Sequence, residues 1–110
     1  MAHTTRTILQ NALRTYGADE QMRMTTEECA ELIKALSKFH RTMVDSKAGK
    51  KAKDAAEMNV IEEIADVQIM CEQMAIYFGA CEVEDEKAMK IKRLAERMAG
   101  LRSKKTKEGK

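Results

Sequence analysis

Two short acidic motifs are the parts of this sequence best suited to chemistry. Residues 26–32 read Thr-Glu-Glu-Cys-Ala-Glu-Leu, and residues 61–67, which lie 35 positions later, read Ile-Glu-Glu-Ile-Ala-Asp-Val. On an α-helix, side chains three positions apart lie on the same face, so each motif places two carboxylates side by side. If the two helices pack antiparallel along their apolar stripes, we expect the two pairs to face each other. The pairs are Glu28 with Glu31 and Glu63 with Asp66.

Four carboxylates in one place repel one another unless a cation binds between them. Like charges one helical turn apart already cost roughly 0.2–0.5 kcal/mol on an exposed surface. Hard divalent cations resolve this repulsion, because Mg²⁺ and Mn²⁺ bind carboxylate oxygens and retain waters for substrate phosphates. Neither His3 nor His40 has a carboxylate three residues before it, which excludes the Glu-x-x-His pattern of di-iron bundles. The motifs thus predict a Mg²⁺ site, with Mn²⁺ as the other candidate; each motif taken alone is also compatible with a solvated acidic surface.

Basic residues near the end of the chain could bind the phosphates of a substrate. Lys90, Arg93 and Arg97 follow the spacing i, i+3, i+7 and therefore share one helix face. Lys34 and Lys38, which follow the first acidic motif, are further candidates of the same kind. Lysine and arginine neutralise phosphate oxygens that a metal ion leaves free. The alternative interpretation of these positions is an ordinary solvated surface.

The spacing of apolar residues predicts four helices. We expect the first over residues 4–16, ended by Gly17, and a second one capped by Asp19, with a capping box at Thr25 as the alternative start. Residues 45–53 form the predicted loop, Asp54 begins a third helix that Gly79 ends, and acidic residues 84–86 lie in the first turn of a fourth. The inward stripe predicted for the second helix consists of Met22, Cys29, Leu32, Ile33, Leu36, Phe39, His40 and Met43. The inward stripe predicted for the third helix consists of Val60, Ile61, Ile64, Val67, Cys71, Met74, Ala75 and Phe78.

Composition sets the class of protein. The chain has 110 residues, no proline, 44% hydrophobic residues and only 4% aromatic ones, which favours a single all-α domain over residues 1–101. Residues 102–110 contain five basic residues and one acidic residue, and we expect a disordered tail. Three cysteines without metal-ligand spacing fit a reducing compartment, and no segment is apolar enough to cross a bilayer. A soluble cytoplasmic protein is the expectation.

The acidic motifs resemble the signature of the MazG-like, all-α nucleoside triphosphate pyrophosphohydrolases, EExxE on one helix and ExxD on the next. Here the signature stands as Glu27-Glu28-Cys-Ala-Glu31 and Glu62-Glu63-Ile-Ala-Asp66, and residues 90–97 are similar to the basic last helix of small phage-type members. The resemblance implies a compact four-helix bundle completed by assembly into homodimers or homotetramers. It also implies Mg²⁺-dependent cleavage of a nucleoside triphosphate between its α and β phosphates. The implied metal ligands are Glu28, Glu31, Glu63 and Asp66, and the implied water-activating residues are Glu27 and Glu62.

A second hypothesis is a helical dimerisation or regulatory module without catalytic activity. Its motivation is the basic tail, which could bind nucleic acid, and the heptad-like spacing of the apolar stripes. This hypothesis leaves the repeated acidic pairs unexplained. We therefore expect a nucleotide substrate rather than nucleic acid or a membrane as the partner.

Overall fold

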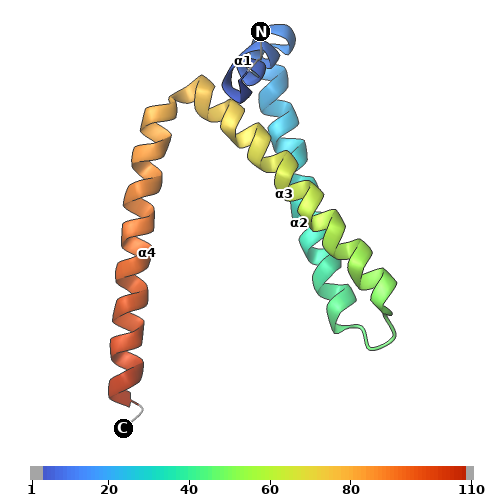
Figure 1. Cartoon of the computed structure of the whole chain (residues 1–110), viewed down its shortest axis with the longest axis vertical. Coiled ribbons are helices and arrows are strands. Elements are labelled where there is room, and N and C mark those ends of the chain that lie inside the picture. Colours follow the sequence, from blue (N-terminus) through green and yellow to red (C-terminus); the bar gives the residue numbers. More distant parts are fainter. Residues whose placement is uncertain (1–3, 109–110) are drawn as a thin grey trace. The chain divides into compact units, whose positions relative to one another are not determined.

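The computed structural model describes residues 4–108, and every regular element in this range is an α-helix (Figure 1). The prediction of an all-α chain with four helices is therefore confirmed. The helices are α1 (Thr5–Tyr16), α2 (Ala18–Val44), α3 (Lys50–Phe78) and α4 (Ala80–Glu108). None of them combines the length and the apolar character that crossing a membrane requires.

Local chemistry explains where α1 begins and where α1 and α3 end. The Thr4 hydroxyl accepts a hydrogen bond from the Thr7 N–H at 3.1 Å, which caps one of the free donors at the start of α1. Gly17 and Gly79 both have a positive φ, 86° and 138°, in which a side chain would be strained. Both glycines end the helices that the sequence predicts them to end.

The helix starts differ from several predictions. α2 begins at Ala18, so the early start is confirmed, although Asp19 lies inside the first turn instead of capping it. α3 begins at Lys50, one turn before the predicted start at Asp54. α4 begins at Ala80, directly after Gly79, so the predicted acidic first turn lies further along the helix. The reason is that Lys- and Ala-rich segments have high helix propensity, which extends a helix beyond its capping signal.

The described chain divides into two compact units, one that ends at Phe78 and one that begins at Gly79. The first unit contains α1, α2 and α3, and the second unit contains α4. Whether α4 completes a four-helix bundle, and whether residues 1–101 act as one domain, stay predictions. α4 continues through Glu108, into the segment from residue 102 for which the sequence predicts a disordered tail. The tail stays a prediction, and residues 109 and 110 lie outside the described range.

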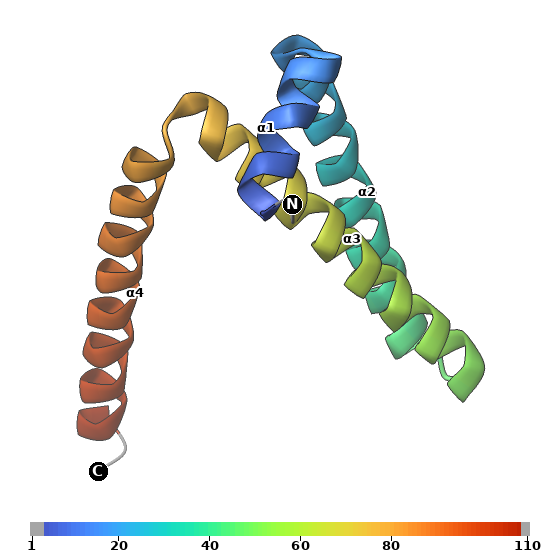
Figure 2. The ribbon, with the colours of Figure 1, turned by 45° about the horizontal axis from the view of Figure 1, so that its top comes forward.

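α2 and α3 form an antiparallel pair joined by a short loop, and α1 lies at the other end of the pair (Figures 1 and 2). The residues of α2 and α3 along the contact are spaced by three and four positions, as in a coiled-coil seam. All of them are buried or half-buried. They are Gln21, Thr25, Glu28, Leu32, Ala35, Phe39 and Thr42 on α2, and Lys53, Ala56, Val60, Glu63, Val67, Met70 and Met74 on α3.

The predicted apolar stripes are only partly buried, and this is a correction. A minority of each stripe lies in the seam: Leu32 and Phe39 on α2, and Val60, Val67 and Met74 on α3. Most of the remaining stripe residues lie one position further along each helix than a seam residue, about 100° further round. A pair of helices buries one side of each, so a wide apolar stripe cannot be covered by a single neighbour. Five of these remaining residues are between 40 and 66% exposed, and we call them the apolar face: Ile33, Leu36, Met43, Ile61 and Ile64.

α1 packs against the end of the pair through Leu9, which is 6% exposed. Gln73 of α3 is 2% exposed, and its side-chain N–H donates to the Leu9 carbonyl at 3.4 Å. This contact joins α3 to α1, but it satisfies only the N–H side of the amide, because Gln73 Oε1 is buried without a hydrogen-bond partner among the described residues.

Candidate functional site

Three carboxylates from the two acidic motifs converge in the seam between α2 and α3. Glu28, Glu63 and Asp66 each offer one oxygen, and these oxygens lie within 4.8 Å of one another. The antiparallel packing of α2 and α3, which the sequence analysis gave as the condition, therefore brings the two motifs together. We call these three residues the carboxylate cluster. Glu28 and Glu63 are half-buried and Asp66 is exposed, so the cluster opens to solvent on one side.

Glu63 carries the most unusual atom of the cluster. Its Oε2 is buried and has no hydrogen-bond partner among the described residues. A buried polar atom without a partner is costly, and a buried carboxylate is stable only next to a cation or several donors. The neighbouring groups here are two further carboxylates, which add repulsion. The three carboxylates are close enough together to bind a single cation, and their oxygens are the hard donors that divalent cations such as Mg²⁺ and Mn²⁺ bind.

Glu28 also lies in an environment that disfavours a negative charge on its carboxyl. Burial raises the pKa of the Glu28 carboxyl above its ordinary value of 4.5, and the charges of Asp66, Glu63 and Glu31 raise it further. A hydrogen bond with Asp66 acts in the same direction, because the protonated acid donates to the carboxylate. Without a cation, the cluster therefore favours binding of a proton.

This shift predicts how stability depends on pH when no metal is bound. Just above pH 4.5 the folded protein keeps a proton on Glu28 that the unfolded chain has lost. Because the raised pKa belongs to the folded state, stability falls as pH rises through that pKa. We expect the melting temperature in EDTA to fall relative to that of Glu28→Gln as the pH rises above about 4.5. Parallel curves for the two proteins would contradict this, and Glu57→Gln, an exposed acid outside the cluster, is the control.

Glu27 and Glu31, which are also predicted site residues, are held by neighbouring cations. Glu31 forms an ion pair with Lys34 Nζ at 3.9 Å and is not part of the carboxylate cluster. Its charge nevertheless raises the pKa of Glu28. Glu27 is paired with Arg23, which also binds Glu20. These two acids therefore lie beside the cluster, each next to a cation of its own helix. Glu62 precedes Glu63 and is exposed.

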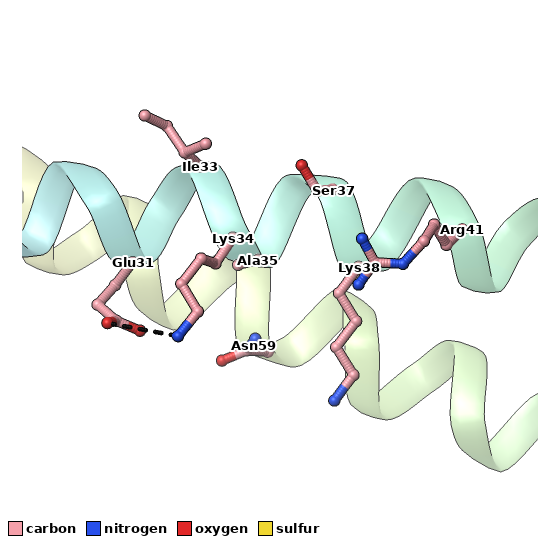
Figure 3. Close-up of a pocket in the computed structure, with 8 residues that line it drawn as sticks. All are labelled: Glu31, Ile33, Lys34, Ala35, Ser37, Lys38, Arg41 and Asn59. Carbon is pink, nitrogen blue, oxygen red and sulfur yellow. Dashed lines mark ion pairs between the residues drawn. The ribbon is translucent and has the colours of Figure 1, made fainter.

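Figure 3 shows the residues that line a basic cavity. Glu31 lies one turn after Glu28, and Asn59 lies one turn before Glu63, so the cavity lies beside the cluster, toward the loop that joins α2 to α3. Its volume is about 490 Å³. Glu31, Lys34 and Lys38 project from α2 on the side where Asn59 of α3 lies, whereas Ile33 points to the opposite side (Figure 3). The lining residues are Glu31, Ile33, Lys34, Ala35, Ser37, Lys38, Arg41 and Asn59.

A second cavity lies toward α1, and we call it the thioether cavity because two methionines line it. Its volume is about 370 Å³. Met24 lies one helical turn before Glu28, and Met70 lies one turn after Asp66, so this cavity borders the cluster on the side away from the loop. It is lined by Tyr16, Glu20, Gln21, Met24 and Met70.

The basic residues predicted on the last helix share one face of α4. Lys90, Arg93 and Arg97 line a hollow of about 690 Å³ together with Glu96. They belong to the second unit of the chain, so a role toward the carboxylates of the first unit stays a prediction. Lys38 is the one predicted phosphate-binding residue that lies in the first unit, beside the cluster.

Sequence reasoning missed three polar residues around the site. Arg23 holds Glu27, and its i, i+4 spacing to Glu27 was a usable signal. Arg41 lies one turn after the position of Lys38 on the same helix. Asn59 lies one turn before Glu63, and only the antiparallel packing of α3 on α2 brings it to the basic cavity.

The sequence matches no protein-family model, and neither the curated proteins nor the solved structures give a significant match.

Proposed function

We propose that this chain is a Mg²⁺-dependent nucleoside triphosphate pyrophosphohydrolase of the MazG-like type. The observation that carries the proposal is the convergence of three carboxylates, one with a buried and unpaired oxygen, from two matching helical motifs. A metal ion at this position neutralises charge that develops on a phosphate and lowers the pKa of a bound water. The non-catalytic alternative gives no reason for the buried Glu63 oxygen.

The proposal assigns a role to each acid of the two motifs. Glu28, Glu63 and Asp66 would hold the metal, and Glu31, released from Lys34, would be a fourth ligand. Glu27 and Glu62 orient the attacking water and accept its proton, with Glu27 placed by its ion pair to Arg23. Water attacks the α phosphorus, the bond to the bridging oxygen breaks, and pyrophosphate leaves with the electron pair.

The thioether cavity supports placement of the nucleoside. It borders the carboxylate cluster, and Tyr16, Met24 and Met70 offer the polarisable and apolar surfaces against which a base packs. The buried amide of Gln21 adds hydrogen-bonding capacity at its wall. In this placement the nucleoside lies toward α1.

Purified protein with Mg²⁺ and a panel of ribo- and deoxyribonucleoside triphosphates tests this function. We expect release of pyrophosphate and a nucleoside monophosphate, together with a rise in melting temperature on adding Mg²⁺, because a ligand that binds only the native state stabilises it. The double variant Glu28→Gln/Asp66→Asn should lose both effects, whereas the control Glu57→Gln/Asp54→Asn should keep them. Release of orthophosphate alone, or turnover of no nucleotide, contradicts the proposal.

We also propose that the protein assembles with copies of itself through the apolar face. In an antiparallel pair, the positions one residue beyond each seam lie on the same side, so Ile33 and Leu36 of α2 lie on the side of Ile61 and Ile64 of α3. Contiguous apolar surface of this kind marks an interaction site. A second copy presents the same face, which lets two α2·α3 pairs form a bundle with each cluster on an outer side.

A further inference from the structure

We infer that the basic cavity binds the two terminal phosphates of the substrate, the part that leaves as pyrophosphate. This inference rests on the proposed function. It places phosphate binding mainly on the C-terminal half of α2, whereas the sequence analysis placed it mainly on the last helix. Its residues are Lys34, Lys38 and Arg41 of α2 and Asn59 of α3.

The cavity carries positive charge that the protein does not balance. Lys34 is paired with Glu31, but Lys38 and Arg41 form no ion pair with any residue in the described part of the chain. The three cations and the single carboxylate leave an excess of two positive charges in one cavity. Lysine and arginine gathered in this way are suited to several phosphate oxygens at once.

The position of the basic cavity along the helices indicates in which direction the triphosphate of the substrate extends. Lys34 and Lys38 lie one and two turns after Glu31 on α2, and Asn59 lies one turn before Glu63 on α3. Because the helices are antiparallel, both displacements point away from the cluster toward the loop. The thioether cavity lies in the opposite direction. A nucleotide with its α phosphate at the cluster therefore extends its β and γ phosphates into the basic cavity.

The ion pair between Glu31 and Lys34 joins a residue of the proposed metal site to a residue of the basic cavity (Figure 3). The two charged atoms are 3.9 Å apart and both side chains are more than half exposed, so the pair is weak. A metal ion attracts Glu31, and a phosphate attracts Lys34. Binding of metal and pyrophosphate together therefore separates the pair without leaving either charge unbalanced, and we expect the two ligands to bind cooperatively.

Titration with inorganic pyrophosphate in the presence of Mg²⁺ tests the inference. We expect Lys38→Gln/Arg41→Gln to weaken pyrophosphate binding about 100-fold, since each charge-assisted contact is worth about tenfold or more. The rise in melting temperature with Mg²⁺ alone should persist in this variant. The control Lys47→Gln/Lys51→Gln removes the same charge outside the cavity and should bind pyrophosphate as the unaltered protein does.

The outcomes separate this inference from the proposed function. Unchanged pyrophosphate affinity in Lys38→Gln/Arg41→Gln overturns the inference, even where Mg²⁺ binding and turnover of the unaltered protein uphold the function. A loss of affinity in Arg93→Gln/Arg97→Gln alone also overturns it, because the phosphates then lie on α4. Pyrophosphate binding that depends on Lys38 and Arg41 supports the cavity, and absence of turnover in the same protein counts against the function only.

Discussion

Replacing Glu63 by glutamine is expected to abolish Mg²⁺ binding and lower turnover at least about 100-fold, while raising the stability of the metal-free protein. Residues that merely support a metal ligand are worth about 10–100-fold, so loss of a ligand costs at least that much. Stability changes in the opposite sense because the variant removes a buried charge that has two carboxylate neighbours and no partner for its Oε2.

The opposite signs distinguish a metal ligand from a structural residue. A glutamate that held the fold together would lower both activity and stability on replacement. Turnover, calorimetric Mg²⁺ titration and melting temperature in EDTA, measured on one preparation, give all three quantities. Glu72→Gln, an exposed acid on the same helix, is the matched control. A Glu63→Gln protein that still shows the full Mg²⁺-dependent rise in melting temperature would place the metal elsewhere.

The double variant Ile33→Glu/Ile61→Glu is expected to convert the assembled protein into monomers. Full burial of an isoleucine side chain contributes about 1.5–3 kcal/mol, and these two residues are 66 and 51% exposed in the single chain. A symmetric interface contains each residue twice, so the loss is roughly 4 kcal/mol, or about 10³-fold in the dissociation constant. Light scattering coupled to size-exclusion chromatography and analytical ultracentrifugation measure the change.

The rise in melting temperature with Mg²⁺ serves as the internal check on that experiment, because it is a property of the single chain. The carboxylate cluster is built from one chain, so the monomeric variant should retain the rise in melting temperature with Mg²⁺. Ile69→Glu is the control, because Ile69 is 50% exposed but lies five residues after Ile64, about 140° further round α3. Assembly that survives in Ile33→Glu/Ile61→Glu, or that is lost equally in Ile69→Glu, would show that the interface lies on another surface.

Much of the local structure could be predicted from the sequence. Gly17 and Gly79 end their helices because a positive φ is strained for other residues. The repeated Glu-Glu-x-Ala-acid pattern places its carboxylates on equivalent helix faces, and the antiparallel connection through residues 45–49 brings those faces together. Helix starts were less predictable, since capping signals at Asp19 and Asp54 compete with the helix propensity of the residues before them.

The sequence by itself determined that four helices form and that two carboxylate pairs share the same relation to their apolar stripes. Only the tertiary structure decided which part of each stripe is buried. Helical periodicity gives the width of a stripe, and the choice between neighbouring seams depends on what packs against it. By placing Glu28 and Glu63 in the seam itself, packing on a single neighbour turned the carboxylates toward each other and left Ile33 and Ile61 exposed. The same packing joined Asn59 to the cations of α2, a contact between distant residues that periodicity along one helix does not contain.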